Sequence, residues 1–494
     1  MSRNRLYLIS AGIMISLFLA SMEGTVVATA MPSIVAQLGG LSMYSWVFAI
    51  FMLTTTTTIP LYGKFSDLYG RKSVFVVSLG LFMIGSLLCG SASSMQQLVI
   101  FRGLQGLGAG GVIPLAYTIV GEIFPIKQRA RMQGLFSSVW GISSVIGPLI
   151  GGFLVDQVSW SWVFYINLPL GLLALALVWF AWRDAPRNPA DRVAVDGAGA
   201  LLLMAGVLAL LLGLNELGRP LGLWLIAASL AIFLVLYFVE RRAVDPILPL
   251  RLFPNRVFVI AILGVFFSGW AAFGTISYVP LFVQAVLGTS ATQAGITLAP
   301  MSLVWTLASI ICGRILLRVG YRALILVGMT SLLAGALLML TIGVQTTPVD
   351  IMLYTSLMGI GMGLTLPAFT IAIQAIVRRE ELGVATSSLE FGLNIGGTLG
   401  VSVMGAMLSA RLAALLLRAG IDPAQVSLGA LIDPLPGASA VAEGPLRLAL
   451  SGAIVSMFVL AVIPALCGLV VALFIPPGNV TQVAEKYASR PASE

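Results

Sequence analysis

Residues 63–72 of the chain read GKFSDLYGRK, and residues 313–322 read GRILLRVGYR. The two segments share their glycines and flanking cations, but Leu317 stands where the first segment has Asp67. Each segment joins the second and third apolar runs of a unit of six such runs. This repeat predicts two related halves, a plan that recurs in transporters whose halves rock around a site between them.

Long apolar runs make up most of the chain around these segments. The 494 residues are 59% hydrophobic and 9% charged, whereas a soluble domain is about 25% charged. Each run has roughly twenty residues, enough to cross about 30 Å of hydrocarbon, and none alternates like a barrel strand, so we expect helices. The runs lie near residues 7–30, 44–62, 74–92, 98–120, 132–155, 160–182, 198–217, 221–239, 257–286, 294–317, 321–343, 351–376, 384–410 and 449–474.

The predicted fold is an all-α integral membrane protein with fourteen transmembrane helices. Residues 1–182 are expected to form an N-terminal six-helix bundle, and residues 257–494 a C-terminal one. Residues 183–256 are expected to add two inserted transmembrane helices with cytoplasmic linkers. The segment 411–447 is expected outside the cell, where Asp422-Pro423 favours the start of a short helix.

The cations are distributed unevenly among the predicted loops. With the N-terminus in the cytoplasm, most of the 27 Lys and Arg residues fall in cytoplasmic segments, as the positive-inside rule requires. This bias explains the net charge of +8 without a nucleic-acid partner, and it places both termini on the cytoplasmic side of the cell (inner or plasma) membrane. A signal peptide is disfavoured, because the first apolar run is too long and Glu23 interrupts it.

Several chemistries are missing from the sequence. It contains no histidine and no HExxH, nucleophile-elbow or Walker-loop motif, so we expect neither an enzyme nor a metal or cofactor site. The cysteines lie in apolar runs, where small hydrophobic side chains are a better interpretation than disulfides or metal ligands. They are Cys89, Cys312 and Cys467.

Further motifs resemble those of a known family. With GKFSDLYGRK, they are LVIFRGLQGLG (98–108), GISSVIGPLIGG (141–152), SWVFYINLPLG (161–171), YVPLFVQAVLG (278–288) and GIGMGLTLPAF (359–369). Together they resemble the fourteen-span drug/proton antiporter branch of the major facilitator superfamily. The resemblance covers nearly the whole chain. It implies the fold of that superfamily and multidrug efflux by alternating access, with a proton gradient as the energy source.

The resemblance also implies roles for two of the segments. The loop at 63–72 is expected to be a conformational latch, with a positive turn capped by an aspartate as the alternative. The segment at 141–152 is expected to be an antiporter motif, and close helix packing through its glycines is an equally good interpretation. The latch residues are Gly63, Asp67, Gly70 and Arg71, and those of the antiporter motif are Gly141, Gly147, Pro148, Gly151 and Gly152.

Three charged residues fall inside predicted spans, where an insertion cost of about 2.5–3.5 kcal/mol makes each a functional candidate. Glu23 and Arg102 share the outer half of the membrane, so one can neutralise the other. Glu23 also matches the acidic position of the branch's first-span motif, with a purely structural ion pair as the alternative. Glu390 has no cation one helical turn away. We expect it to act with Glu23, as a second proton site or as the anionic contact of cationic substrates, unless it is a neutral group hydrogen-bonded to another helix.

The thirteenth span departs from the branch. Leu393 stands where the branch often carries an arginine before a GG pair, and Glu390 lies one turn earlier, so no role is carried over from that arginine. Aromatic residues could line a cavity for hydrophobic compounds, although packing against lipid or helices is the simpler interpretation for any one of them. The candidates are Trp140, Trp270, Tyr278 and Trp305, together with Asn394.

The sequence thus predicts a proton-coupled secondary antiporter that exports amphipathic or cationic hydrophobic compounds. It is expected to be a monomer whose partners are these small substrates, protons and membrane lipids. Two alternatives stay open. One is an exporter of a lipid or another defined metabolite on the same fold, and the other is a substrate-sensing membrane receptor without transport.

The predicted topology can be tested by cysteine labelling. Cysteines introduced at residues 183–197 should react with an impermeant maleimide only from the cytoplasmic side. Those introduced at residues 411–447 should react only from outside, because an odd number of spans separates the two segments. Labelling of intact cells and of inverted vesicles measures both, and an N-terminal tag accessible from outside would contradict the count of spans.

Overall fold

The computed structural model describes residues 3–39, 43–182, 196–216, 220–243, 250–289, 291–418 and 445–477. Within these residues all regular structure is helical. The predicted linker at 183–195 and most of the predicted outer segment, including Asp422-Pro423, lie outside the described residues.

The helices fall into three groups along the chain. The first group is α1 (Arg3–Leu38), α2 (Tyr44–Tyr69), α3 (Arg71–Gly90), α4 (Met95–Ile123), α5 (Ile126–Gln157), α6 (Trp162–Tyr165) and α7 (Asn167–Ala181). The second is α8 (Gly197–Asn215) and α9 (Pro220–Glu240). The third is α10 (Arg256–Leu281), α11 (Ala291–Val319), α12 (Tyr321–Leu338), α13 (Pro348–Ile376), α14 (Leu382–Arg418) and α16 (Pro445–Leu473).

Thirteen spans among the described residues are long and apolar enough to cross a membrane. Helix α5 has 32 residues and packs between α1 and α11, so we count it as the fourteenth. The sixth span is broken at Ile166, where α6 meets α7. The prediction of an all-α chain with repeated membrane-spanning helices is confirmed.

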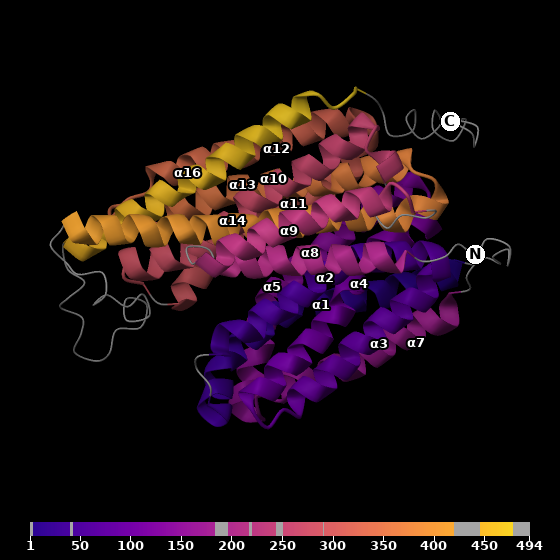
Figure 1. Cartoon of the computed structure of the whole chain (residues 1–494), viewed down its shortest axis with the longest axis horizontal. Coiled ribbons are helices and arrows are strands. Elements are labelled where there is room, and N and C mark those ends of the chain that lie inside the picture. The colour runs from indigo at the N-terminus through magenta and orange to yellow at the C-terminus, as the bar shows by residue number, and fades with distance from the viewer. Residues whose placement is uncertain are drawn as a thin grey trace.

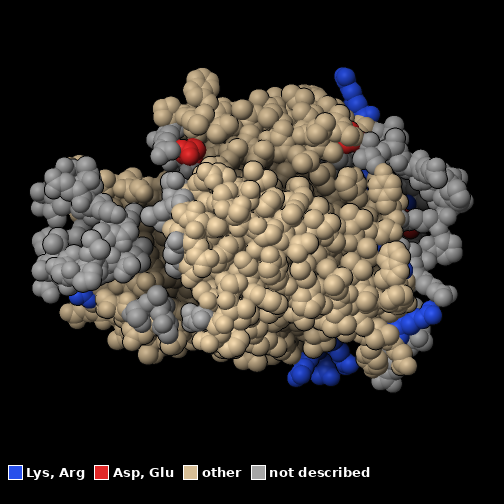
Figure 2. All heavy atoms as spheres, turned by 90° about the horizontal axis from the view of Figure 1, so that it is seen from below, with Lys and Arg blue, Asp and Glu red and all other residues tan. Residues whose placement is uncertain are grey.

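The outer surface of the bundle is apolar. Figure 2 shows one face as a broad uncharged surface, with most of its Lys and Arg atoms toward one side. Large hydrophobic side chains on the surface include Trp224, 76% exposed, and Phe180, 81% exposed. Exposing an apolar surface of this extent to water is unfavourable, so we interpret it as a surface that contacts lipid.

The first and third groups of helices each form a bundle with its own core, called the N-half and the C-half below (Figure 1). The α8 helix lies along the seam between them. Its apolar stripe, which includes Leu203, Val207 and Leu211, packs with Leu53 of α2 and Ile395 of α14. A spacing of four residues puts the members of this stripe on one helical face, so α8 contacts both halves at once.

The repeated segments fold alike. Gly70 has φ 102° and Gly320 has φ 85°, a left-handed region that favours glycine. In each half a cation after this glycine reaches the last helix of its own bundle. Lys72 Nζ donates to the Trp182 carbonyl at 2.8 Å, and Arg322 donates to the Leu473 carbonyl at 3.3 Å. The end of the bundle where α2 meets α3 is called the latch end below; α1 begins there, on the right of Figure 1.

Candidate functional site

Asp67 joins the two halves at the latch end. It lies in the last turn of α2, and its two carboxylate oxygens accept hydrogen bonds from the first backbone N–H groups of α14. The distances are 3.0 Å to Gly383 N and 2.8 Å to Val384 N. The first N–H groups of a helix have no partner within it, and the helix dipole favours an anion there. Asp67 therefore caps a helix that belongs to the other half.

Arg71 extends this contact into a charge network. Its guanidinium donates to Asp67 at 2.6 Å and to the carbonyl of Arg379 at 2.5 Å. Its Nε lies 3.0 Å from a carboxylate oxygen of Glu122 but forms no aligned hydrogen bond with it, so this attraction is coulombic. Glu122 in turn accepts a bond from Arg379 at 2.7 Å. The network alternates in sign and crosses the seam twice.

Gly63 lets α2 and α14 touch beside this network. A Cβ built on Gly63 would collide with the hydroxyl of Ser387 and lie 2.7 Å from the Gly383 carbonyl oxygen. A larger residue at either glycine would push the helices apart, because backbone atoms cannot yield as a flexible side chain can. Of the predicted latch residues, the structure brings Gly63 and Asp67 against α14 and Arg71 against Arg379 just before that helix, and Gly70 forms the turn between α2 and α3.

A second seam lies between α5 and α11. The hydroxyl of Ser137 is 2.5 Å from that of Ser309, and Thr306 donates to the Ser137 carbonyl at 2.9 Å. A Cβ on Gly141 would lie 2.5 Å from the Thr306 hydroxyl. These bonds and those of the latch network join the halves in the part of the bundle between this level and the latch end.

The predicted antiporter motif divides into parts that face different neighbours. Gly141 faces α11 of the other half, as described above. Gly147 and Gly151 face α1 of their own half, where Thr25 and Thr29 occupy the space of a Cβ. Gly152 faces open space, and the side chain of Pro148 lies outside the described residues. The glycines thus hold α5 against α1 on one side and against α11 on the other.

Glu23 and Arg102 form a buried ion pair in the N-half. They are 2% and 1% exposed, and a guanidinium nitrogen lies 2.5 Å from the carboxylate. The guanidinium also donates to the Val47 carbonyl at 3.1 Å and lies 4.1 Å from the ring centre of Phe51, a cation–π distance. Nε and one terminal nitrogen of Arg102 thus have hydrogen-bond partners, and the charge of Glu23 is paired, as buried charges require.

Polar residues that sequence reasoning missed complete this cluster. Gln105 donates to one oxygen of Glu23 at 3.0 Å, and Asn167 donates to the other at 2.8 Å. Both amides also reach the hydroxyl of Ser86. Gln105 follows Arg102 by three residues, so helical spacing could have pointed to it. Asn167 and Ser86 come from other spans, and no local signal marks them.

The surroundings of Glu390 differ from those of Glu23. Its side chain is half-buried, and among the described residues it forms no side-chain hydrogen bond or ion pair. Its helix, α14, packs against α4 of the N-half. Asn394, one turn later, donates to the Glu390 carbonyl at 2.8 Å.

The aromatic candidates do not meet in one place. Trp305 packs against Phe273 with ring centres 6.5 Å apart, and Phe273 fills the space beside Gly397, two turns after Glu390 on α14. Tyr278 instead donates to the Val401 carbonyl at 2.7 Å, a bond between α10 and α14. Trp140 is 43% exposed, and the indole nitrogen of Trp270 is buried without a partner in the part of the chain described.

Within the described residues, no group of three metal-ligating side chains comes together. Cys89 and Cys312 are buried and Cys467 is half-buried, each as a free thiol. The described residues therefore offer a buried ion pair, two helix seams and, in Glu390, a half-buried carboxylate without a described side-chain partner. Such an arrangement fits a protein that moves a solute across a membrane rather than one that transforms it.

Comparison with known proteins defines the class. The family model of the Major Facilitator Superfamily matches residues 13–401. The chain is 41% identical to the multidrug transporter protein MdtP of Bacillus subtilis, over 82% of this chain and 75% of that protein. It is 36% identical to multidrug resistance protein 3 of the same organism, over 80% of this chain and 78% of that protein.

Solved structures agree on the fold at low sequence identity. The proton:xylose symporter XylE superimposes with a TM-score of 0.65 at 14% identity, over 99% of this chain and all of that one. The human organic anion transporter MFSD10 gives a TM-score of 0.63 at 14% identity, over 94% of this chain and all of that one. The protein is a multi-pass membrane transporter and not an enzyme. It belongs to the major facilitator superfamily.

The buried pair predicts a specific pattern of stability. Arg102→Met should lower the melting temperature of the purified protein strongly, because a buried carboxylate that loses its cation costs about 3–5 kcal/mol. Glu23→Gln together with Arg102→Met should recover most of that loss. Fluorescence-monitored unfolding measures both, with Arg411→Met, at an exposed arginine, as the control. A double variant less stable than Arg102→Met would contradict the pairing.

Proposed function

We propose that this protein is a proton-coupled antiporter that exports hydrophobic cations and other amphipathic compounds. The observation that carries the proposal is the contrast between two carboxylates. Glu23 is held by Arg102, Gln105 and Asn167, whereas the side chain of Glu390 has no hydrogen bond or ion pair with a described residue and lies opposite the other half. The names of the two bacterial relatives, both multidrug proteins, support the same substrate class.

Glu390 is the group we assign to charge exchange. A carboxylate without a partner is costly to bury while charged. It is therefore expected to carry a proton when the space between the halves is dry, and to accept a cation or release the proton when water enters. Phe273 of α10 packs beside Gly397 of α14, and Trp305 of α11 packs against Phe273. Aromatic faces attract organic cations, which complements the carboxylate.

In this proposal the conformational change takes place at the two seams between the halves. With the latch end in the cytoplasm, the described contacts close the protein toward the inside, which corresponds to an outward-facing state. Rocking of the halves would separate Asp67 from α14 and part α5 from α11, and the site would then open inward. We propose that both termini are cytoplasmic, that the protein resides in the cell membrane and that it works as a monomer.

Transport by purified protein in liposomes tests the coupling. An imposed pH gradient should drive uptake of a fluorescent hydrophobic cation without ATP, and a protonophore should abolish it. Glu390→Gln should reduce transport of the cation by about tenfold, the effect of a contact of about 1.4 kcal/mol. Glu380→Gln makes the same chemical change at an exposed site ten residues earlier and should leave transport unchanged.

The outcomes separate the two roles of Glu390. A loss confined to the cationic substrate indicates a charge contact, while a loss for cationic and neutral substrates with a flattened pH profile indicates proton coupling. Unchanged rates and pH profiles for both substrates would remove Glu390 from the site. Transport that requires ATP would overturn the antiporter proposal as a whole.

A further inference from the structure

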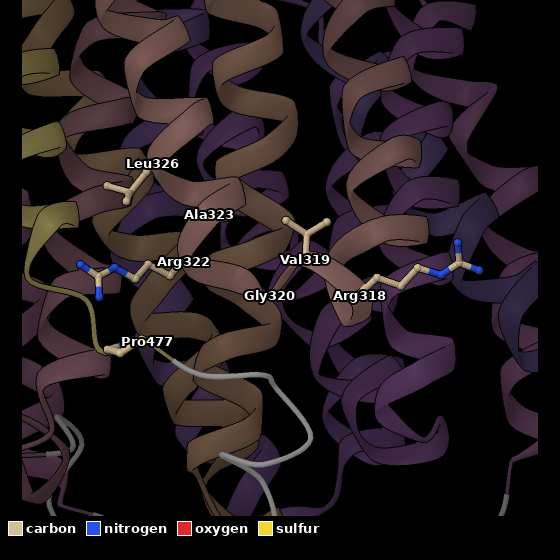
Figure 3. A pocket seen from close by; sticks show the side chains of 7 residues that line it. All are labelled: Arg318, Val319, Gly320, Arg322, Ala323, Leu326 and Pro477. Atoms are coloured by element: carbon tan, nitrogen blue, oxygen red, sulfur yellow. The ribbon is translucent and has the colours of Figure 1, made fainter.

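A cavity lies at the latch end of the C-half, beside the turn between α11 and α12. Its volume is about 520 Å³. It is lined by Arg318, Val319, Gly320, Arg322, Ala323, Leu326 and Pro477 (Figure 3). This turn is the second copy of the repeated segment, and neither the ion pair nor the latch network uses any of these residues.

The cavity carries uncompensated positive charge. Arg318 and Arg322 are its only ionisable residues, and neither pairs with a carboxylate among the described residues. Arg322 donates to the Leu473 carbonyl at 3.3 Å. Figure 3 shows the two guanidinium groups on opposite sides of the turn, pointing apart. They therefore do not converge on one point.

Comparison with the first copy of the segment explains why these two arginines have no carboxylate partner among the described residues. There Asp67 neutralises Arg71 at 2.6 Å, and Glu122 adds a second carboxylate. In the second copy Leu317 replaces the aspartate, and Arg318 replaces the apolar Leu68. Tyr321 in turn replaces Arg71, so each copy carries three cations, and the loss of the carboxylate leaves the second copy with one more positive charge than the first.

The rest of the cavity is apolar and continues along a membrane-spanning helix. Leu326 follows Arg322 by four residues, which places both on one face of α12. Val319 and Val327 beside them are 52% and 57% exposed. A free inorganic anion gains nothing from such a wall, whereas a lipid matches both parts, with a charged headgroup at the arginines and acyl chains along α12. Basic pockets at the membrane surface bind anionic headgroups in this way.

We propose that this cavity binds an anionic phospholipid, with its phosphate held by Arg322, its acyl chains along the face of α12 that carries Leu326, and the positive charge of Arg318 on the other side of the turn adding to the attraction. The site is independent of the transported substrate and of proton coupling. It makes the second copy of the repeated segment a lipid contact, where the first copy is a contact between the halves.

The test uses full-length protein in neutral detergent, titrated with phosphatidylglycerol and followed by native mass spectrometry. Arg318→Gln with Arg322→Gln should weaken binding about thirtyfold, since each basic residue at an anionic lipid surface contributes about fivefold. The control is Arg411→Gln with Arg418→Gln, which removes the same charge from exposed sites at the other end of α14. It should stay within about twofold of the unmodified protein.

The lipid preference of the unmodified protein is a second readout, and it does not depend on whether a variant folds. The protein should retain phosphatidylglycerol in preference to phosphatidylcholine, and glycerol phosphate at the same concentration should not compete. Equal retention of the two lipids, or competition by glycerol phosphate as strong as by the lipid, would overturn the proposal. So would equal losses in the two double variants when both unfold at the same temperature.

Discussion

Two backbone N–H groups at the start of α14 need an acceptor, and Asp67 of the other half provides it. This capping interaction sets the arrangement of the latch end. It requires α2 and α14 to approach within backbone contact, which Gly63 and Gly383 allow. It also places Arg71 where it can bind the Arg379 carbonyl. A helix cap supplied across a seam can form only while the halves stay together at this end.

The asymmetry of the repeat follows from the same carboxylate. Both copies of the segment turn at a glycine with positive φ, and both place a cation on the last helix of their own half. Only the first copy has an acid, so only the first can cap a helix across the seam. Leu317 in the second copy leaves the neighbouring arginines without an internal partner. The two copies thus share a backbone turn and differ in the charges that it carries.

The sequence predicted the parts of this account that depend on local pattern. Run length gave the spans, and helical rise put Glu23 and Arg102 at similar depth, where the structure joins them at 2.5 Å. The sequence could not predict interaction partners that come from distant spans. Asp67 bonds to residues more than 300 positions away, and Glu122 was overlooked because a charge at the end of a span looks like any loop residue. Asn167 could not be predicted either, because only the packing of the folded protein brings α7 against α1.

The central claim is that Asp67 holds the halves together at the latch end. It is tested most directly by electron–electron spin distances between labels at Tyr69 and Glu380, both exposed, in protein without native cysteines. A single short distance is expected for the parent protein. Asp67→Asn should add a longer distance and shift the populations by about tenfold or more, because a charge-assisted hydrogen bond contributes about 1.5–3 kcal/mol. Leu317→Ala, at the equivalent site of the second copy, should leave the distances unchanged. The same short distance in Asp67→Asn as in the parent would contradict the account.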